Sequence, residues 1–435
     1  MEQLYKLSLH ELVAGARRQR WSAAEVVRGY LERIETLEPR VQAWEHLDVK
    51  GALARANAAD AGAARGALHS APIAIKDIID VAGMPTRCGS RIYASAAEVA
   101  HSAECVEALE RAGAIVVGKS VTTEFAYYTP GKTRNPWNPS HTTGGSSMGS
   151  AASVACGMAA GALGTQTNGS VIRPAAFCGV VGFKPSLGTI SNSGTLDPWP
   201  TLDHLGVFAR NVADAALLAS IIVRDGTVSG SIRMPAHAPR LALVRTPVWR
   251  LAERAQQEML MANAKALAHA GAKVEELGLP SAFDDAHRAH RVIMAYEGAR
   301  YFNDLQRSHR ERMSARFNEL LDEGSAISET DYRAALDATQ NLRREFARMI
   351  ESYDVVITPP ATGEAPATLE ETGNPAFCTI WTLLGVPAIT IPVGLGSAGL
   401  PLGLQLVGPN REDDRTLSIA AWCESHLSFA GLPLQ

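Results

Sequence analysis

The segment from Thr142 to Gly188 constrains this chain most, because it is rich in glycine, serine and alanine and carries almost no charge. Such a composition is typical of flexible linkers. This segment, however, also holds large apolar side chains such as Val154, Leu163 and Phe177, which belong in a buried core. Small residues between buried apolar ones indicate close backbone packing. The segment therefore predicts a tightly packed core around a functional site.

Helix-like and strand-like patterns alternate along the 435 residues of the chain. The first sixty residues look helical, because Ser8-x-x-Glu11 and Ser22-x-x-Glu25 are capping-box patterns that precede apolar-periodic runs. The β-branched run at 71–80 looks like a strand. This alternation predicts an α/β fold with a largely buried sheet. Length alone favours two or three domains.

Charge and cysteine content restrict the partners and the compartment. The net charge is −4 and no dense Lys/Arg block is present, so we predict neither nucleic acid nor membrane as a partner. Residues 1–12 lack the apolar run of a secretory signal, and the weakly polar stretch 151–164 is too short to span a bilayer. The six cysteines include no C-x-x-C pair and are typical of free thiols. These features predict a cytoplasmic protein.

The run Gly113–Ser120 matches the phosphate-binding pattern G-x-x-x-x-G-K-S. Its four central residues, Ala-Ile-Val-Val, are typical of a buried strand. A loop that offers its N–H groups to phosphates cannot also use them in a sheet. An ATP-binding enzyme that uses this run is therefore kept only as an alternative.

The run Gly145–Gly149 matches the G-x-S-x-G nucleophile elbow of hydrolases with a Ser-His-Asp triad. That elbow follows a strand, whereas residues 138–144 are turn formers. It also needs a later histidine, and after His309 the chain has only His426. The context therefore argues against this type of triad.

Polar side chains suited to hydrolysis gather in three further segments, 75–77, 144–147 and 165–174. Together with several other runs they make the chain resemble the amidase signature family over nearly its whole length. The matching runs are Pro72–Val81, Asn135-Pro-Trp-Asn138, the Gly/Ser-rich core through Pro174–Pro185, Thr201-Leu-Asp203, Gly385–Gly394 and Gly399–Gln405.

The resemblance implies one α/β domain over residues 1–435, with a mixed central β-sheet covered by α-helices on both faces. Within this domain we expect N-terminal helices at 1–60 and a catalytic core at 70–210. The charged helical segment 285–350 is expected to flank the substrate pocket.

The resemblance also implies a Ser–cis-Ser–Lys triad without a metal or cofactor: Ser170 as the nucleophile, Ser146 as the bridging serine after a cis peptide, and Lys76 as the base. A serine hydroxyl attacks only when a neighbour accepts its proton. A lysine serves as a base at neutral pH only when burial lowers its pKa. Lys76 has apolar neighbours in the sequence, and Asp77 is expected to point to the opposite side of the strand.

The turn 167–170 is expected to form an oxyanion hole from the backbone N–H groups of Thr167, Asn168, Gly169 and Ser170. Three positions near this turn depart from the family pattern. Gln166 stands where the family usually has Asp, Asn168 where it has Gly, and the arginine is Arg173 instead of residue 172. These departures leave the triad in place and bear on substrate preference.

The substrate pocket is expected to include Tyr127, Tyr128, Ser147, Met294 and Trp381. Aromatic walls favour small aryl or alkyl amides, hydrolysed through an acyl-enzyme on Ser170. Carbamates (urethanes) and esters react through the same kind of tetrahedral intermediate and remain alternatives. No carboxylate-binding feature is evident in the sequence.

A second function stays open within the family, namely the glutaminase subunit of a transamidation complex. If the chain is an amidase, we expect its partner to be a small-molecule amide or carbamate substrate, and we expect the chain to be a monomer or a homodimer.

Overall fold

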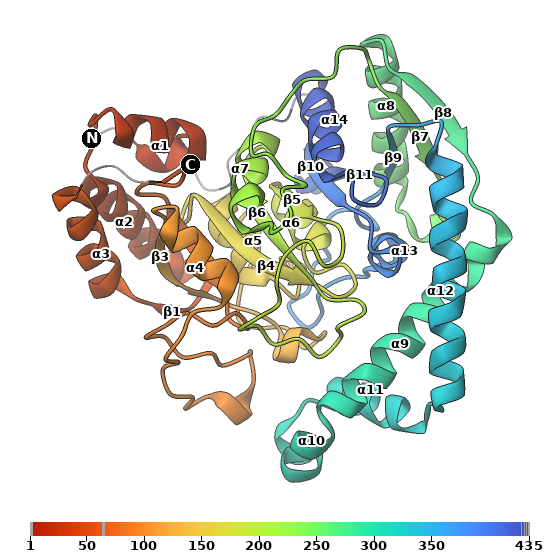
Figure 1. Ribbon diagram of the computed structural model, residues 1–435, viewed down its shortest axis with the longest axis horizontal. Helices are drawn as coiled ribbons and strands as arrows, with labels where there is room; N and C mark the ends of the chain where they lie inside the picture. Colours follow the sequence, from red (N-terminus) through yellow and green to blue (C-terminus); the bar gives the residue numbers. More distant parts are fainter. Residues whose placement is uncertain (1–2, 63–65, 428, 430, 432, 434–435) are drawn as a thin grey trace.

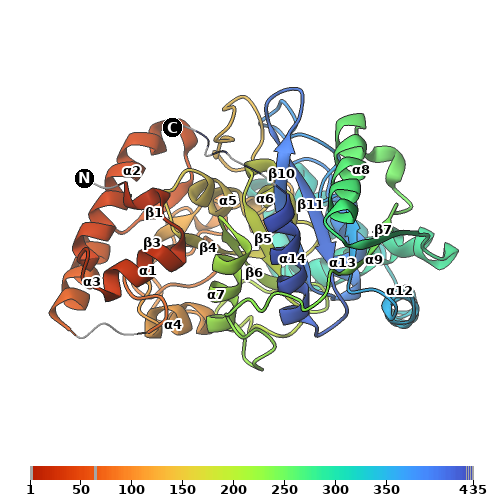
Figure 2. The same cartoon turned by 90° about the horizontal axis from the view of Figure 1, so that it is seen from above.

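An 11-stranded mixed sheet forms the centre of the computed structural model (Figures 1 and 2). The structure describes residues 3–62, 66–427, 429, 431 and 433, so Met1 and Glu2 of the predicted helical segment lie outside the described residues. In spatial order the strands are β1 (Trp44–Leu47), β3 (Ile115–Ser120), β2 (Pro72–Lys76), β4 (Gly161–Gln166), β6 (His204–Ala209), β5 (Val181–Lys184), β10 (Ala388–Leu395), β11 (Pro401–Val407), β9 (Val355–Thr358), β7 (Arg240–Val244) and β8 (Lys273–Leu277). Strands β3, β2 and β4 run parallel, as do β9, β7 and β8.

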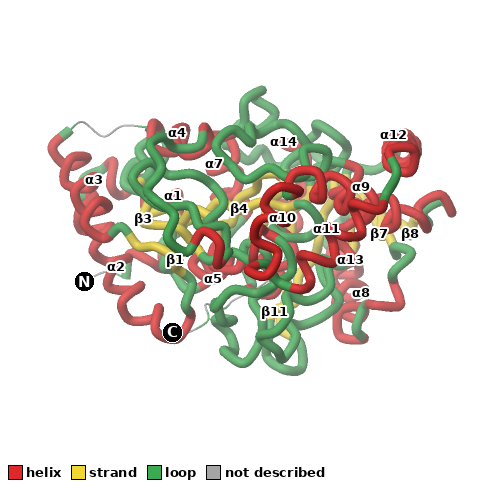
Figure 3. Tube along the Cα trace, turned by 90° about the horizontal axis from the view of Figure 1, so that it is seen from below, coloured by secondary structure: helices red, strands yellow, loops and turns green. Residues whose placement is uncertain are grey.

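Helices cover the sheet in groups. At the β1 end lie α2 (Ala23–Val41) and α3 (Val49–Ala61), and at the other end α8 (Arg254–His269) packs on β8 (Figure 2). One group that packs together contains α1 (Leu9–Arg17), α4 (Glu104–Arg111), α7 (Val212–Ile222) and α14 (Asp413–His426). A pair in mutual contact is α5 (Met148–Ala155) and α6 (Ile172–Cys178). A further group is α9 (Ala286–Tyr301), α10 (Asn303–His309), α11 (Ala315–Ala326), α12 (Glu329–Ile350) and α13 (Ala376–Leu384) (Figures 1 and 3).

Short 3₁₀ helices connect some of these elements. They span Leu4–Lys6, Arg91–Tyr93, Glu124–Ala126, Trp249–Leu251, Ser281–Asp285 and Arg310–Arg312. None of the helices in the described part of the chain combines the length and the apolar character needed to cross a bilayer.

Alternate residues of the central strands are buried on opposite faces. On β2, Ile73 and Ile75 belong to the core that includes side chains of α4 and α7, whereas Ala74 belongs to the core of α5 and α6. This is the period-2 alternation of a strand that is covered on both sides. The predicted α/β fold, with a mixed central sheet under helices on both faces, is confirmed.

Two expected elements differ from the structure. The first sixty residues are not all helical, because β1 pairs with β3 and adds an edge strand to the sheet. The predicted strand 71–80 is wrong beyond Lys76. There the N–H groups of Ile78 and Ile79 donate to the Lys76 carbonyl at 2.8 and 3.0 Å, which turns the chain away from the sheet. The spacing of apolar residues in a sequence can predict a strand. It does not show where a turn ends the hydrogen bonding of that strand with its neighbours.

The phosphate-binding pattern lies in a strand. Residues 115–120 form β3, and all of them are buried. Their backbone groups take part in ladders with β1 and β2. The loop that a phosphate would need is therefore not present here, and the ATP-binding alternative loses its basis.

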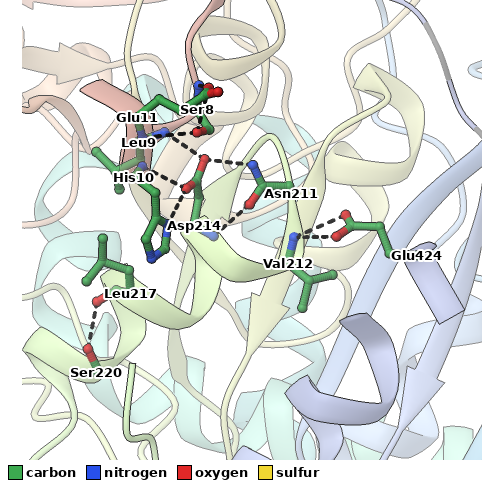
Figure 4. A network of polar contacts seen from close by, with 10 residues as sticks. All are labelled: Ser8, Leu9, His10, Glu11, Asn211, Val212, Asp214, Leu217, Ser220 and Glu424. Carbon is green, nitrogen blue, oxygen red and sulfur yellow. Dashed lines mark hydrogen bonds and ion pairs between the residues drawn. The ribbon is translucent and has the colours of Figure 1, made fainter. Parts of the chain in front are cut away.

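The N-terminal end of α1 is anchored on α7 through one buried carboxylate (Figure 4). Asp214 accepts hydrogen bonds from the N–H groups of Leu9 and His10 at 2.8 and 3.1 Å, and its contact with Nδ1 of His10 is 2.7 Å. The predicted capping box at Ser8 and Glu11 is also present. Helix α1 is thus capped both by its own residues and by a side chain about two hundred positions away.

We expect Asp214→Ala to lower the free energy of unfolding by about 2–3 kcal/mol, because it leaves N–H groups of α1 without an acceptor. Urea denaturation followed by circular dichroism measures this change. The matched control is Asp225→Ala, since Asp225 pairs with Arg411 at the surface and such pairs contribute less than about 1 kcal/mol. Equal losses in the two variants would contradict the anchoring role of Asp214.

Candidate active site

The carboxyl ends of two parallel strands bring the expected triad together. Strands β2 and β4 are neighbours, and they end at Lys76 and Gln166 on the same edge of the sheet. Helix α5 begins directly after Ser147, and α6 begins two residues after Ser170. The Gly/Ser-rich segment therefore supplies two helix starts and a strand end at one place, which is where α/β proteins commonly bind ligands.

Lys76 is fully buried and faces hydroxyl groups instead of a carboxylate. Its Nζ lies 2.6 Å from Oγ of Ser146 and 2.7 Å from Oγ1 of Thr165. Burial lowers the pKa of Lys76 to about 7, against the opposing charge of Asp203. Asp77 instead forms an ion pair of 2.9 Å with Lys119. Both protonation states of Lys76 are therefore accessible near neutral pH.

Ser146 and Ser170 line one cavity. The peptide bond between Gly145 and Ser146 is cis. Lys76 is not among the residues that line the cavity, so its amine reaches this space through the Ser146 hydroxyl. Within the described part of the chain, the Ser170 hydroxyl forms no hydrogen bond, and 8% of this residue is exposed. The arrangement leaves the Ser170 hydroxyl available to a bound carbonyl carbon.

The carbonyl groups of residues 167–169, in the turn before α6, each accept a hydrogen bond that fixes the turn. The contacts are His290 Nε2 to Thr167 O at 2.8 Å, Thr382 Oγ1 to Asn168 O at 2.5 Å, and Arg173 N to Gly169 O at 2.9 Å. Asn168 also accepts from Thr379 at 2.7 Å and donates to Tyr128 at 3.2 Å. The backbone N–H groups of residues 168–170 donate to no acceptor in the described ranges. All four residues of the turn 167–170 line the cavity, and their predicted role as an oxyanion hole stays a prediction.

Gln166 supports this turn without charge. Its Oε1 accepts from the N–H groups of Val171 and Ile172 at 2.8 and 3.0 Å, and its Nε2 donates to Thr382 at 2.9 Å. These N–H groups lie at the start of α6, where a helix has no internal acceptors for them. Gln166 therefore stabilises the turn through neutral hydrogen bonds.

Arg173 lies on the first turn of α6 and lines the cavity. Only 2% of its surface is exposed. Its Nη2 donates to the carbonyl of Gly145 at 2.8 Å and to Oγ1 of Thr372 at 3.1 Å. The guanidinium thus contacts the peptide group that precedes Ser146.

The cavity is narrow, with a volume of about 20 Å³, and has mixed polar and aromatic walls. Its lining residues are Thr123, Ala126, Tyr127, Tyr128, Ser146, Thr167, Asn168, Gly169, Ser170, Arg173, Trp199, Met294 and Thr372. Tyr127, Tyr128 and Met294 were expected from the sequence, and Met294 is the contribution of the segment 285–350.

Ser147 and Trp381 do not line this cavity, which corrects the expectation for both. Ser147 is fully buried, and its Oγ donates to the Thr165 carbonyl at 3.2 Å and accepts the Thr165 N–H at 3.3 Å. Trp381 is fully buried on α13, with its ring 5.6 Å from that of Phe346 on α12. Both side chains therefore belong to the packing behind the site.

Trp199 and Thr372 are lining residues that the sequence did not indicate. Both lie in long connections without a periodic pattern. The Trp199 indole donates to the carbonyl of Met294 at 2.7 Å, which links this connection to α9. The nearby Thr201-Leu-Asp203 run was the only local signal that this connection lies near the site.

The sequence predicts a site without a metal ion, so His, Cys, Asp and Glu side chains are not expected to gather around a common point. Among the described residues, no group of three or more His, Cys, Asp or Glu side chains is arranged to hold a metal ion. The expectation of metal-free chemistry stays a prediction.

Known proteins resemble this chain in sequence and in fold. The family model described as Amidase matches residues 25–417. A glutamyl-tRNA(Gln) amidotransferase subunit from Halothermothrix orenii is 31% identical over 480 aligned positions, which cover 98% of each chain. A crystal structure of an amidase is 31% identical with a TM-score of 0.88, covering 97% of this chain and 100% of that one. The native peptide amidase from Stenotrophomonas maltophilia is 28% identical with a TM-score of 0.84 and 98% coverage of both chains.

The family match extends from α2 into α14 and includes every strand of the sheet. It also spans the strand ends and helix starts that form the cavity. The resemblance noted from short runs is therefore a relationship over the whole fold, and this chain belongs to the amidase family, whose members share its sheet and its helical cover.

Proposed function

We propose that this chain hydrolyses a carbon–nitrogen bond of a small amide through an acyl-enzyme on Ser170, with Ser146 as proton relay and Lys76 as base. The observation that carries this proposal is the 2.6 Å contact between the buried amine of Lys76 and the Ser146 hydroxyl at the wall of the cavity that Ser170 also lines. An uncharged amine at this place has a lone pair for the Ser146 proton.

The bond changes follow from this arrangement. Ser146 passes its proton to Lys76 and takes the proton of Ser170, whose oxygen bonds to the amide carbon. The carbonyl oxygen becomes an oxyanion, which N–H groups of the turn 167–170 stabilise. The C–N bond then breaks, and the proton on Lys76 leaves with the amine through Ser146. Water repeats the sequence on the ester, which releases the acid and frees Ser170.

The walls of the cavity support a small substrate. Tyr127, Tyr128, Trp199 and Met294 provide apolar surface for an aryl or alkyl group. Carbamates and esters react through the same kind of tetrahedral intermediate. An assay of amide hydrolysis should therefore also include one carbamate and one ester. Because esters are intrinsically more reactive than amides, only rapid ester hydrolysis without measurable amide hydrolysis would reassign the chain as an esterase.

A fluorophosphonate probe tests the nucleophile directly. It reacts with activated serines, and peptide mapping by mass spectrometry identifies the modified residue. We expect one adduct on Ser170, with loss of amide hydrolysis in proportion to labelling. An adduct on Ser147, or full labelling with undiminished turnover, would contradict the proposal.

The glutaminase subunit of an amidotransferase is a second candidate, and the curated relatives favour it. Proteins named as subunits of glutamyl-tRNA(Gln) amidotransferase match this chain at 31–34% identity. If this function holds, the chain should release ammonia from glutamine, more rapidly in the presence of co-purified subunits. Hydrolysis of simple amides at least tenfold faster than glutamine, with no co-purified subunit, would favour the stand-alone amidase.

A further inference from the structure

We infer that Tyr128 selects substrates whose acyl part carries a neutral oxygen near the amide to be cleaved, because its hydroxyl donates a hydrogen bond to that oxygen. This inference rests on the proposed function and adds the chemistry of the acyl group to it. The observation is a line of hydrogen bonds from Thr379 through Asn168 to Tyr128, which leaves the Tyr128 proton without an acceptor among the described residues.

Helix α13 orients the side-chain amide of Asn168. Its Oδ1 accepts a hydrogen bond from the Thr379 hydroxyl at 2.7 Å. The other contact of this hydroxyl, at 3.3 Å, is with the carbonyl of Pro375, which can only accept. Thr379 therefore acts as a donor, and the Nδ2 group of Asn168 is turned toward Tyr128.

The hydroxyl of Tyr128 uses its oxygen in this contact and keeps its proton free. Nδ2 of Asn168 donates to that oxygen at 3.2 Å. An amide NH₂ group only donates, so the O–H of Tyr128 points elsewhere. No group in the described ranges accepts its proton. Burial raises the pKa of Tyr128 more than the charge of Arg173 lowers it, so the hydroxyl stays protonated.

The free proton belongs to the wall of the cavity beside the nucleophile. Tyr128 and Asn168 both line the cavity, and Asn168 lies two residues before Ser170 in the same turn. The ring of Tyr128 packs edge-on against that of Tyr127, with the ring centroids 4.7 Å apart. An acceptor for the Tyr128 proton must therefore lie a few bonds from the carbonyl carbon that Ser170 attacks. The cavity volume of about 20 Å³ leaves room for only a short acyl chain there.

This wall distinguishes acyl chains of the same shape. When a chain without an acceptor fills the cavity, the Tyr128 proton is buried with no partner. Leaving a buried donor unsatisfied is costly, whereas an oxygen at the same place accepts the hydrogen bond. The device depends on Asn168, which stands where the family usually has Gly, a residue without a side chain to contact Tyr128.

The test compares methoxyacetamide with butanamide, in which a CH₂ group replaces the ether oxygen. The ether also makes the carbonyl more reactive, so the ratio of the two kcat/KM values is divided by the ratio of the alkaline hydrolysis rates in water. For the unmodified protein we expect this corrected ratio to be about ten in favour of methoxyacetamide. In Tyr128→Phe, which lacks the hydroxyl, it should fall to about one.

Tyr127→Phe is the matched control. Tyr127 also lines the cavity, but its hydroxyl accepts a hydrogen bond from Nη1 of Arg291 at 2.8 Å, beside the ion pair of Arg291 with Glu323. This variant should keep the corrected ratio of the unmodified protein. If Tyr128→Phe does not fold, the corrected ratio of the unmodified protein decides, and a value near one overturns the inference.

Thr379→Val tests the line of hydrogen bonds from outside the cavity, because Thr379 is not a lining residue. Valine cannot donate to Asn168, so the amide is free to turn and to accept the Tyr128 proton itself. We expect the corrected ratio to fall about threefold or more. Thr379→Ser, which keeps the hydroxyl, should restore it. An unchanged ratio in Thr379→Val would overturn the orientation of Asn168 on which the inference depends.

The two levels of the proposal fail in different ways. Fluorophosphonate labelling of Ser170 together with a corrected ratio near one, or with no turnover of methoxyacetamide, would refute only the selection by Tyr128. Absence of labelling and of turnover on both substrates would refute the proposed function itself. A preference for methoxyacetamide that survives in Tyr128→Phe would show that another group binds the ether oxygen, which also overturns the inference.

Discussion

Ser170→Ala is expected to reduce amide turnover by about 10⁵-fold or more, because removal of a catalytic nucleophile leaves only binding and oxyanion stabilisation. The variant should fold normally, since the Ser170 hydroxyl forms no hydrogen bond with the described residues. Ammonia release under saturating substrate measures the change, and thermal unfolding confirms the fold.

Ser147→Ala is the control for this experiment. Ser147 is the central serine of the G-x-S-x-G match, yet it is buried behind the cavity and bonded to Thr165. We expect its loss to reduce turnover by less than about tenfold. The reverse order, with Ser147 essential and Ser170 dispensable, would place the nucleophile at the elbow instead.

Lys76→Met is expected to reduce kcat/KM by about 10³- to 10⁴-fold, which is the upper range for loss of a general base.

The pH profile of kcat/KM gives a sharper test of the role of Lys76. The pKa of Lys76 is lowered to about 7, and only its unprotonated form accepts a proton. Activity of the unmodified protein should therefore rise as the pH increases through about 7 and then level off. Lys76→Met should lose this rise along with most of the rate.

Lys184 offers a matched control for the pH profile. It is also fully buried, and burial lowers its pKa to about 7. Its Nζ donates to the Val386 carbonyl at 2.6 Å, and it does not line the cavity. Lys184→Met should keep the rise near pH 7 even if it lowers stability. Loss of the rise in this variant, or its survival in Lys76→Met, would contradict the role of Lys76.

Local features of the chain were predictable because they depend on residues close in sequence. The capping boxes at Ser8 and Ser22 form as the spacing indicates. The strand character of the run 113–120 follows from its apolar residues and outweighs its match to a phosphate-binding pattern. The family resemblance predicted the confirmed fold class, and it also implied the triad of Lys76, Ser146 and Ser170.

The sequence by itself therefore determined the class of fold, the capping of the first helices and the residues most suited to hydrolysis. The tertiary structure decided that Lys76 is desolvated, that Trp199 and Thr372 form walls of the cavity, and that two nitrogens of Arg173 have no hydrogen-bond partner among the described residues. These properties arise from contacts between segments far apart in the chain, such as residues 173 and 372. Periodicity and short motifs describe only neighbours along the chain, whereas burial and charge pairing depend on which surfaces the packed sheet and helices bring together.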